Sequence, residues 1–289
     1  MSRTTFATDL DTAAITVEPR GSNRRRGSVR HAIYRVPDLA FLPQRLVWQR
    51  PDGVALPTAG ELLLWRFRPE WQAVSKDVAY MRLSKAELAR VKNHPNRALG
   101  KRFAVGRAML RGVLAEMLDC APADVALSDD AHGQPVFVDA HRERIRMQVA
   151  YAGVWIVIGL ATTPLGFGMR LPAPAHDDAD SIDGPFGSAP LARTPLAQSI
   201  EMRSRARYAS LLAATGEPLV DADAYALRQD TAACFVETGK AGDASRSTRW
   251  HILDVPMPGA IHTAVAVAQP VTRIQAFGWA GPDGRVDAS

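Results

Sequence analysis

A long amphipathic helix is the feature that most restricts how this chain can fold. Between residues 97 and 118, apolar side chains recur at the spacing of one helical face. These residues are Phe103, Val105, Met109, Leu110, Val113, Leu114 and Met117. Three arginines fall between them, and a solvated helix face is one interpretation of Arg102, Arg107 and Arg111.

Other helices and strands are expected on both sides of this segment. Ser84, followed three residues later by Glu87, is a capping-box sequence that opens a shorter helix, and Pro95 ends it. A further helix is expected over residues 194–214, with Gly216 as its C-cap. The apolar stretches 145–161 and 165–171 are expected to be antiparallel strands joined by the turn at 162–164, and further strands are expected at 61–67, 248–255 and 262–269.

The order of these elements predicts an α+β fold with two lobes around one cleft. The expected N-terminal lobe spans residues 58–165, and the C-terminal lobe spans residues 166–289. Residues 1–57 are expected to form a basic extension that is partly disordered. Residues 172–190 are rich in Pro, Gly, Asp and Ser, which predicts a flexible linker or lid.

The charge of the chain favours anionic partners without choosing among them. The 289 residues carry a formal charge of +5. Part of the excess lies in the Arg-rich residues 20–30, which are interpreted as a solvated arm. Nucleic-acid or membrane-surface binding through this arm is an alternative of another class. The arm has no aromatic residue before Tyr34, which counts against that alternative.

Targeting and cysteine signals are weak. The N-terminus has no long apolar segment, and the apolar run 154–169 is too short and too interrupted to span a bilayer. We therefore expect a cytoplasmic protein. Cys120 and Cys234 are too few for a disulfide framework or a Cys-based zinc site, and both are expected to fill core positions.

Independent catalytic motifs are absent from the sequence. It has no P-loop, no G-x-G-x-x-G after a strand, no H-E-x-x-H and no G-x-S-x-G. The seven histidines show no metal-ligand spacing. The adjacent carboxylates at 129–130 and 177–178 are expected to cap loops, because neighbours on a strand point to opposite faces.

Six weak motifs occur in an order that is more specific than any one of them. KRFAVGRAMLRGVLAEML at 101–118 is followed by DDAHGQPVF at 129–137 and IRMQVAYAGVWIVIGLA at 145–161. After these come PLGFGMRL at 164–171, YASLLAATGEPL at 208–219 and WHILDVPMPGAIHTAVAVA at 250–268. Together they resemble the monomeric 4′-phosphopantetheinyl transferases, over about residues 60–270.

This resemblance implies two pseudo-symmetric α/β lobes around one cleft. Enzymes of that family move phosphopantetheine from coenzyme A to a serine of an acyl or peptidyl carrier protein. Two acidic residues at i and i+2 of a strand bind Mg²⁺ there, and a Glu on a later helix binds metal or acts as the base. Charge neutralisation and positioning supply most of the catalysis in such phosphoryl transfers.

The sequence departs from the family at those positions. Gly168 and Arg170 stand where the metal pair is expected, and residues 208–209 stand at the Lys-Glu pair of the helix. The Ser-His-Ser triplet of the family is replaced by residues 150–152, with Tyr151 at the centre. We therefore expect the fold without Mg²⁺ binding and without the usual transfer, and no residue is assigned as a metal ligand.

Other positions keep the family pattern and predict a binding site. The resemblance implies that coenzyme A or acyl-CoA contacts Arg102, Arg107, Arg111, His132, Gly133 and Gln134 (a lysine in the family), and Arg170 is a further candidate for this contact. Tyr151, His132 and Arg170 are the candidates for a catalytic role. Arg170 is suited to bind a pyrophosphate or carboxylate in place of a metal, and a salt bridge with the Asp-rich linker is the alternative.

The predicted protein is a monomer that binds coenzyme A, acyl-CoA or an acyl or peptidyl carrier protein. It would act in polyketide, peptide or lipid-like metabolite biosynthesis, as a partner or a repurposed enzyme. An active transferase with an atypical metal site is the alternative. That alternative needs a carboxylate from Asp177, Asp178 or Asp180 to reach the cleft.

Overall fold

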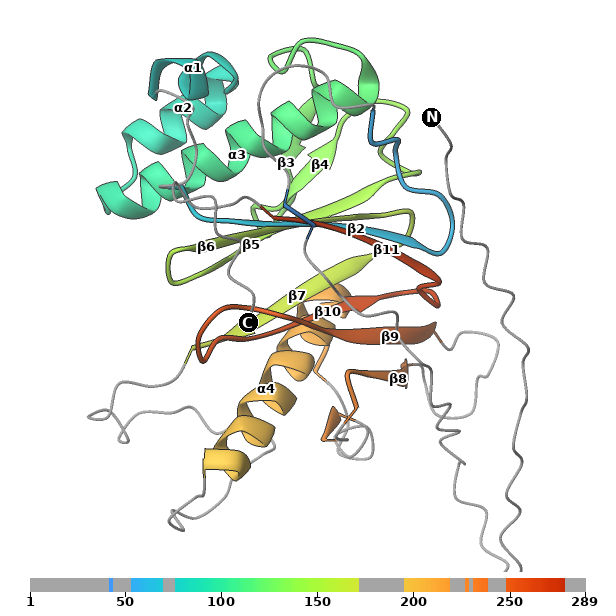
Figure 1. Ribbon diagram of the computed structural model, residues 1–289. Helices are drawn as coiled ribbons and strands as arrows, with labels where there is room; N and C mark the ends of the chain where they lie inside the picture. Colours follow the sequence, from blue (N-terminus) through green and yellow to red (C-terminus); the bar gives the residue numbers. More distant parts are fainter. Residues whose placement is uncertain are drawn as a thin grey trace, which may run out of the picture. The chain divides into compact units, whose positions relative to one another are not determined.

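Two β-sheets pack face to face, and one long helix covers the outer face of each (Figure 1). The computed structural model describes residues 42–43, 53–69, 76–171, 195–218, 227–228, 231–238 and 248–278, which lie in one unit spanning residues 31–289. The predicted α+β class is confirmed, whereas the pseudo-symmetry of two lobes and the lobe boundaries stay predictions. Within these ranges, no helix combines the length and apolar composition needed to cross a bilayer.

The first sheet has the strand order β1-β11-β2-β6-β5. Its strands are β1 (Leu42–Pro43), β2 (Glu61–Phe67), β5 (Arg146–Ala152), β6 (Trp155–Ala161) and β11 (Arg273–Gly278). β11 runs parallel to β1 and β2, while β6 is antiparallel to β2 and β5. A strand near the C-terminus therefore completes a sheet whose other strands lie between residues 42 and 161.

The second sheet has the order β7-β10-β9-β8, and all of its pairings are antiparallel. Its strands are β7 (Leu165–Arg170), β8 (Ala233–Thr238), β9 (Thr248–Val255) and β10 (His262–Val267). A small hairpin of β3 (Leu127–Asp129) and β4 (Pro135–Phe137) follows the helix of the first sheet. The helices are α1 (Lys76–Met81), α2 (Lys85–Lys92), α3 (Arg97–Leu118) and α4 (Pro195–Thr215).

The strands of the first sheet are apolar on both faces because each face meets another layer. On β2, Leu63, Trp65 and Phe67 pack against the α3 side. Leu62 and Leu64 enter the cluster shared with the second sheet. A strand buried on both faces reads as a continuous apolar run rather than as an alternation, which explains why ELLLWRF alternates poorly and is still a strand.

The helix boundaries follow the local signals in the sequence. Ser84 is the N-cap of α2, and its hydroxyl accepts from Glu87 N (3.2 Å) while Ser84 N donates to Glu87 Oε2 (2.8 Å). This confirms the predicted capping box. α3 coincides with the predicted 97–118 segment. Gly216 follows α4 with φ +73° and donates to Leu212 O (2.8 Å), as expected of a glycine C-cap.

Helix α4 lies unusually close to β7. Gly166 and Gly168 both face this helix, and a Cβ at position 168 would lie 1.9 Å from Ala206 O and 2.3 Å from Ser210 N. At position 166 it would lie 2.3 Å from Ser210 O. The glycines of LGFGMR therefore let the backbones of α4 and β7 approach each other. Residues with side chains cannot occupy either position without moving the helix.

The expected antiparallel pairing of segments 145–161 and 165–171 is wrong. The first segment forms the β5–β6 hairpin within the first sheet, whereas the second is β7 in the other sheet. β6 and β7 meet through their faces, because a Cβ at Gly159 would lie 2.7 Å from the Phe167 ring. Residues 162–164 therefore carry the chain from one sheet to the other instead of forming a hairpin.

The expected core position of Cys120 is also wrong. Cys120 is exposed, because the chain leaves α3 at the left-handed C-cap Asp119 and turns outward. Cys234 on β8 is buried, as predicted. The predicted 172–190 linker and most of the predicted N-terminal extension, including the arginines at 20–30, lie outside the described residues.

Replacing Gly168 with Ala tests the close packing of α4 on β7. We expect the variant to lose roughly 1–3 kcal/mol or more of unfolding free energy, because the added methyl group overlaps the α4 backbone. Gly53→Ala is the matched control, since nothing lies within 4 Å of a Cβ there. Guanidinium unfolding measures both variants, and equal stability of the two would contradict this packing.

His251 predicts a fall in stability at acidic pH. Burial, with a smaller contribution from Arg249, lowers the pKa of His251 to about 4. Its Nδ1 accepts from Val271 N (2.9 Å), and its ring stacks on Phe235. The unfolded chain binds a proton near pH 6.5 and the folded chain does so only near pH 4. The contribution of neutral His251 to the free energy of unfolding is therefore complete above about pH 6.5. As the pH falls towards 4, up to roughly 3 kcal/mol of this free energy is lost.

Urea unfolding between pH 4 and 7 checks this prediction. His251→Gln keeps a side-chain acceptor but does not titrate, so its stability should fall less steeply over the same range. Parallel pH profiles for the two proteins would show that His251 does not carry the effect.

Candidate functional site

The turn between β3 and β4 is built as the resemblance predicted. Gly133 adopts φ +75°, a conformation that glycine accepts without strain. Asp130 Oδ1 accepts from His132 N and Gln134 N, both at 2.8 Å. Asp130 thus caps the loop, as expected of this carboxylate pair. The turn places His132, Gly133 and Gln134 beside α2, α3 and β5.

Two arginines converge on one carboxylate next to this turn. Arg107 Nη2 donates to Asp129 Oδ1 and to Gly133 O, and Arg90 Nη1 donates to Asp129 Oδ2 (2.7 Å). Both guanidinium groups also lie near the Phe103 ring, with Cζ 4.3 Å from its centroid for Arg90 and 5.3 Å for Arg107. Two positive charges therefore share one negative partner.

Arg107 has an unmet donor. Its side chain is buried, and its Nη1 has no hydrogen-bond partner among the described residues. Burial lowers the pKa of Arg107, while the charge of Asp129 opposes that change. A buried polar atom without a partner is uncommon in folded proteins. An acceptor oxygen from a ligand would complete the hydrogen bonding of this guanidinium.

Tyr151 packs against α3, close to Arg102, the third arginine of the group. Arg102 Nη1 donates to Gly153 O, and Arg102 Cζ lies 5.1 Å from the centroid of the Tyr151 ring. Burial raises the pKa of Tyr151 to about 12, although three nearby arginines oppose the shift. The phenol therefore keeps its proton at neutral pH, so it acts as a donor rather than as a base. We call Arg90, Arg102 and Arg107 the basic cluster.

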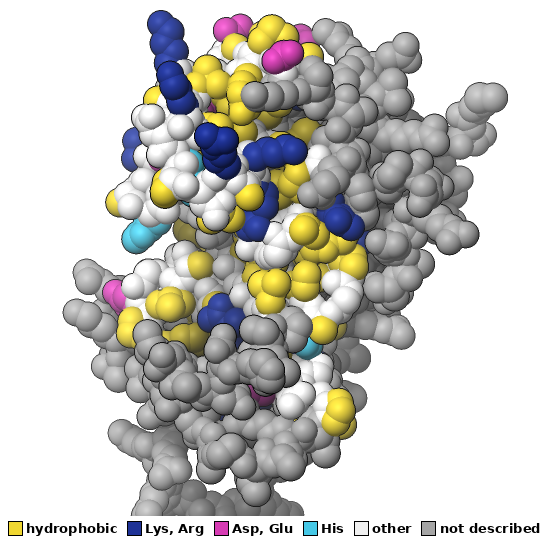
Figure 2. Space-filling view, turned by 90° about the vertical axis from the view of Figure 1, so that its left-hand side faces the viewer, with side chains coloured by type: hydrophobic (Ala, Val, Ile, Leu, Met, Phe, Trp, Pro, Cys, Tyr) yellow, Lys and Arg dark blue, Asp and Glu magenta, His cyan; other side chains and the backbone are white. Residues whose placement is uncertain are grey.

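Figure 2 shows Lys and Arg side chains gathered among hydrophobic ones on the upper part of one face. The basic cluster and the exposed Lys101 belong to the helices of the same part of the fold. Such a concentration of one sign of charge favours the approach of anions.

Arg111 lies away from this group. It is buried, where its Nε donates to Glu87 Oε2 (2.9 Å) and its Nη1 donates to Val125 O (2.8 Å). The solvated-face interpretation is therefore wrong for Arg107 and Arg111. Hydrophobic periodicity treats Arg as a polar residue and so predicts that it is exposed. Its aliphatic side chain and planar guanidinium can nevertheless be buried when hydrogen-bond acceptors are present.

Arg170 stands at the end of β7, opposite His262 on β10. It is exposed, and its Nη1 donates to Met169 O (3.0 Å). Partial desolvation of its guanidinium and the charge of Arg205 on α4 lower the pKa of Arg170. Leu171 lies 3.3 Å from where a Gly153 Cβ would be, so the ends of β5 and β7 are adjacent. Arg102 of α3, which donates to Gly153 O, and Arg170 of β7 thus both lie at these adjacent strand ends.

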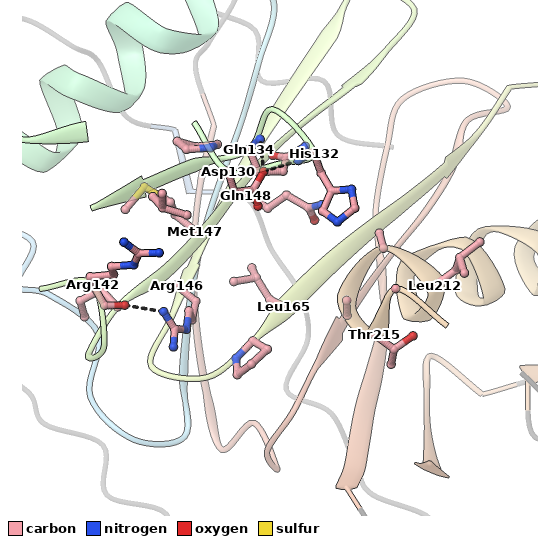
Figure 3. Close-up of a pocket in the computed structure, with 17 residues that line it drawn as sticks. Asp130, His132, Gln134, Arg142, Arg146, Met147, Gln148, Leu165, Leu212 and Thr215 are labelled. Carbon is pink, nitrogen blue, oxygen red and sulfur yellow. Dashed lines mark hydrogen bonds between the residues drawn. The ribbon is translucent and has the colours of Figure 1, made fainter. Parts of the chain in front are cut away.

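His132 and Gln134 line a cavity of about 570 Å³ on another side of the turn (Figure 3). The site residues expected from the sequence therefore divide into three places: the basic cluster, this cavity and the end of β7. Arg111 belongs to none of them. In the described part of the chain, no group of three or more His, Cys, Asp and Glu side chains is placed to hold a metal ion.

Arg90 and Asp129 are site residues that sequence reasoning missed in this role. Arg90 lies on α2, outside the motifs that carried the resemblance, and Asp129 was interpreted as a loop cap. The sequence signal for Arg90 was a basic residue on the helix that precedes the RFAVGR segment. Arg90 and Arg107 meet at Asp129, and Arg90 and Asp129 are 39 residues apart, so spacing alone does not predict the contact.

Comparison with known proteins finds one informative similarity. No protein-family model matches the chain. Over 122 residues, it is 31% identical to a Synechocystis sp. protein named "Putative 4'-phosphopantetheinyl transferase". This similarity covers 42% of the chain, and the chain spans less than half of the length of that relative. The finding supports the resemblance at the level of the superfamily.

Gly106 and Tyr151 are expected to be energetically coupled. A Cβ at Gly106 would lie 2.7 Å from Tyr151 Oη. Gly106→Ala should cost roughly 1–3 kcal/mol in the wild-type background. It should cost less in Tyr151→Phe, where the closest atom is missing.

A double-mutant cycle measured by chemical unfolding isolates this coupling. We expect a coupling energy on the order of 1 kcal/mol, and the gain in helix propensity from Ala cancels between the two backgrounds. Additive effects of the two substitutions would contradict the contact.

Proposed function

We propose that this protein is a 4′-phosphopantetheinyl transferase-like protein that binds coenzyme A or acyl-CoA without the usual Mg²⁺-dependent transfer. The similarity to the Synechocystis sp. protein and the ordered motifs support the family relationship. The proposed loss of transfer activity rests on the residues of β7 in this chain and not on the similarity to the Synechocystis sp. protein.

The packing of Gly168 against α4 is the observation that carries the proposal. This residue stands where the resemblance predicts the first acidic metal ligand, and its α4-facing side has no room for a Cβ. A carboxylate at that position would need α4 to move. Arg170, at the second position of the pair, brings a positive charge to the same strand end.

Cationic side chains supply the charge that a metal would otherwise supply. The charge of Arg205 on α4 contributes to lowering the pKa of Arg170, so both cations act at this end of β7. Guanidinium groups bind phosphate and pyrophosphate through paired hydrogen bonds. The basic cluster, with the unmet donor of Arg107 and the neutral phenol of Tyr151, offers a second set of donors for phosphate groups.

The expected partner is an acyl or peptidyl carrier protein of polyketide, peptide or lipid-like metabolite biosynthesis. The protein would bind it as a monomer, either as a regulatory partner or as an enzyme acting on the pantetheine thioester. An active transferase is the second candidate. It requires carboxylates from residues outside the described ranges, such as Asp177 or Asp178.

Titration calorimetry with coenzyme A tests the binding site. We expect binding whose affinity is the same with Mg²⁺ and with EDTA, because the ligand phosphates are held by arginines. Arg102→Gln should weaken binding by roughly tenfold or more, since hydrogen bonds to charged groups contribute about 1.5–3 kcal/mol. Lys101→Gln is the matched control: it removes the same charge from the neighbouring, exposed position of α3.

The controls separate the outcomes. Binding that requires Mg²⁺ would contradict arginine-based recognition and favour the active transferase. Equal losses in Lys101→Gln and Arg102→Gln would show that net charge, rather than the basic cluster, attracts the ligand.

A further inference from the structure

A second candidate binding site lies between β5 and the C-terminal end of α4. Its walls come from the β3–β4 turn, from β5 and the segment before it, from the start of β7, and from residues 212–216. We call it the β5–α4 cavity. No member of the basic cluster lines it, and Arg170 does not line it. Its volume of about 570 Å³ is in the range of pockets that hold small organic molecules.

Two glutamines are oriented by backbone groups so that they offer donors. Gln134 Oε1 accepts from Val149 N (3.2 Å), and Gln148 Oε1 accepts from Phe167 N. A backbone N–H donates only to an oxygen of a side-chain amide, so both amide orientations are determined. The amide nitrogens of these two lining residues therefore remain for other partners. Neither amide nitrogen donates a hydrogen bond to another described residue.

Basic side chains add to the donors at one end of the cavity. Arg142 and Arg146 both line it, and Arg146 Nη1 donates to Arg142 O, which fixes one end of that guanidinium (Figure 3). His132 reaches towards the cavity from the turn. Asp130 is the acidic lining residue, and its Oδ1 is already an acceptor for two backbone N–H groups. The polar groups of the wall thus favour a ligand with acceptor atoms and negative charge.

The rest of the wall is apolar. Its apolar lining residues are Ile145 and Met147 at the start of β5, Leu165 at the start of β7 and Leu212 of α4. Leu212 is 38% exposed although it is a large hydrophobic residue. Apolar walls with a few oriented polar groups are typical of small-molecule sites. The combination suits a molecule with an anionic head and an apolar body.

We propose that the β5–α4 cavity binds an organic carboxylate with an aliphatic body. The carboxylate lies at the Arg142–Arg146 end, where Arg146 donates to it, and the amides of Gln134 and Gln148 remain as donors elsewhere in the wall. The aliphatic body lies along Leu165 and Leu212. This site is separate from the basic cluster, so the inference does not depend on coenzyme A binding.

Octanoate is the probe for this site, and titration calorimetry with chemical-shift mapping is the measurement. Arg146→Gln should weaken octanoate binding by roughly tenfold to a hundredfold, as expected for the loss of a charge-assisted hydrogen bond. Arg144→Gln is the matched control, because Arg144 lies in the same segment, is exposed and does not line the cavity. Leu212→Glu places a negative charge at the apolar wall and should also reduce binding of the anion.

Two further measurements, with octanol and with an Arg102 variant, define the ligand class and the location of the site. Octanol keeps the aliphatic body but lacks the charge, so it should bind at least about tenfold more weakly than octanoate. Arg102→Gln should leave octanoate binding unchanged. No octanoate binding, equal binding of octanol, or equal effects of Arg144→Gln and Arg146→Gln would each overturn the proposal.

Discussion

The close approach of α4 to β7 is the constraint on which the rest of this structure depends. Gly166 and Gly168 let two backbones meet where side chains would normally separate them. The same strand presents Leu165 and Phe167 to the other face, where they join the apolar cluster between the two sheets. One alternating strand therefore connects the α4 layer to the first sheet. Beyond the two glycines, Arg170 ends the strand and is exposed at the surface.

Buried arginines make a second set of connections. Arg111 ties α3 to Glu87 of α2 and to the loop at Val125, and Arg207 ties α4 to Asp254 of β9. Removing one partner of such a buried pair is expected to be costly, because the other charge stays buried. Arg107 differs from these two in having an unmet donor. That difference separates a structural arginine from a candidate binding residue on the same helix.

Local signals in the sequence predicted much of the fold. The Ser84–Glu87 capping box, the 97–118 helix and the Gly216 C-cap depend on neighbours in the chain, so spacing alone reveals them. β11 was missed because its burial is uneven and its partner β2 lies far away in sequence. The β3–β4 hairpin was missed as strands because each strand has three residues.

The site was only partly predictable for the same reason. The resemblance pointed to Arg107, Gly133 and Tyr151, which the structure places near one another. It did not distinguish Arg107 from Arg111, since both are buried and only their partners across the fold separate their environments. The orientation of Gln134 and Gln148 depends on backbone groups of other strands. No motif predicts such an arrangement.

Intact mass spectrometry of a carrier protein tests the central claim most directly. Apo acyl and apo peptidyl carrier proteins would be incubated with this protein, coenzyme A and Mg²⁺, with an active phosphopantetheinyl transferase as positive control. The account predicts modification of the carriers in the control and no phosphopantetheine gain with this protein. A phosphopantetheine gain with this protein would contradict it and would mean that β7 is not the source of the essential metal ligands.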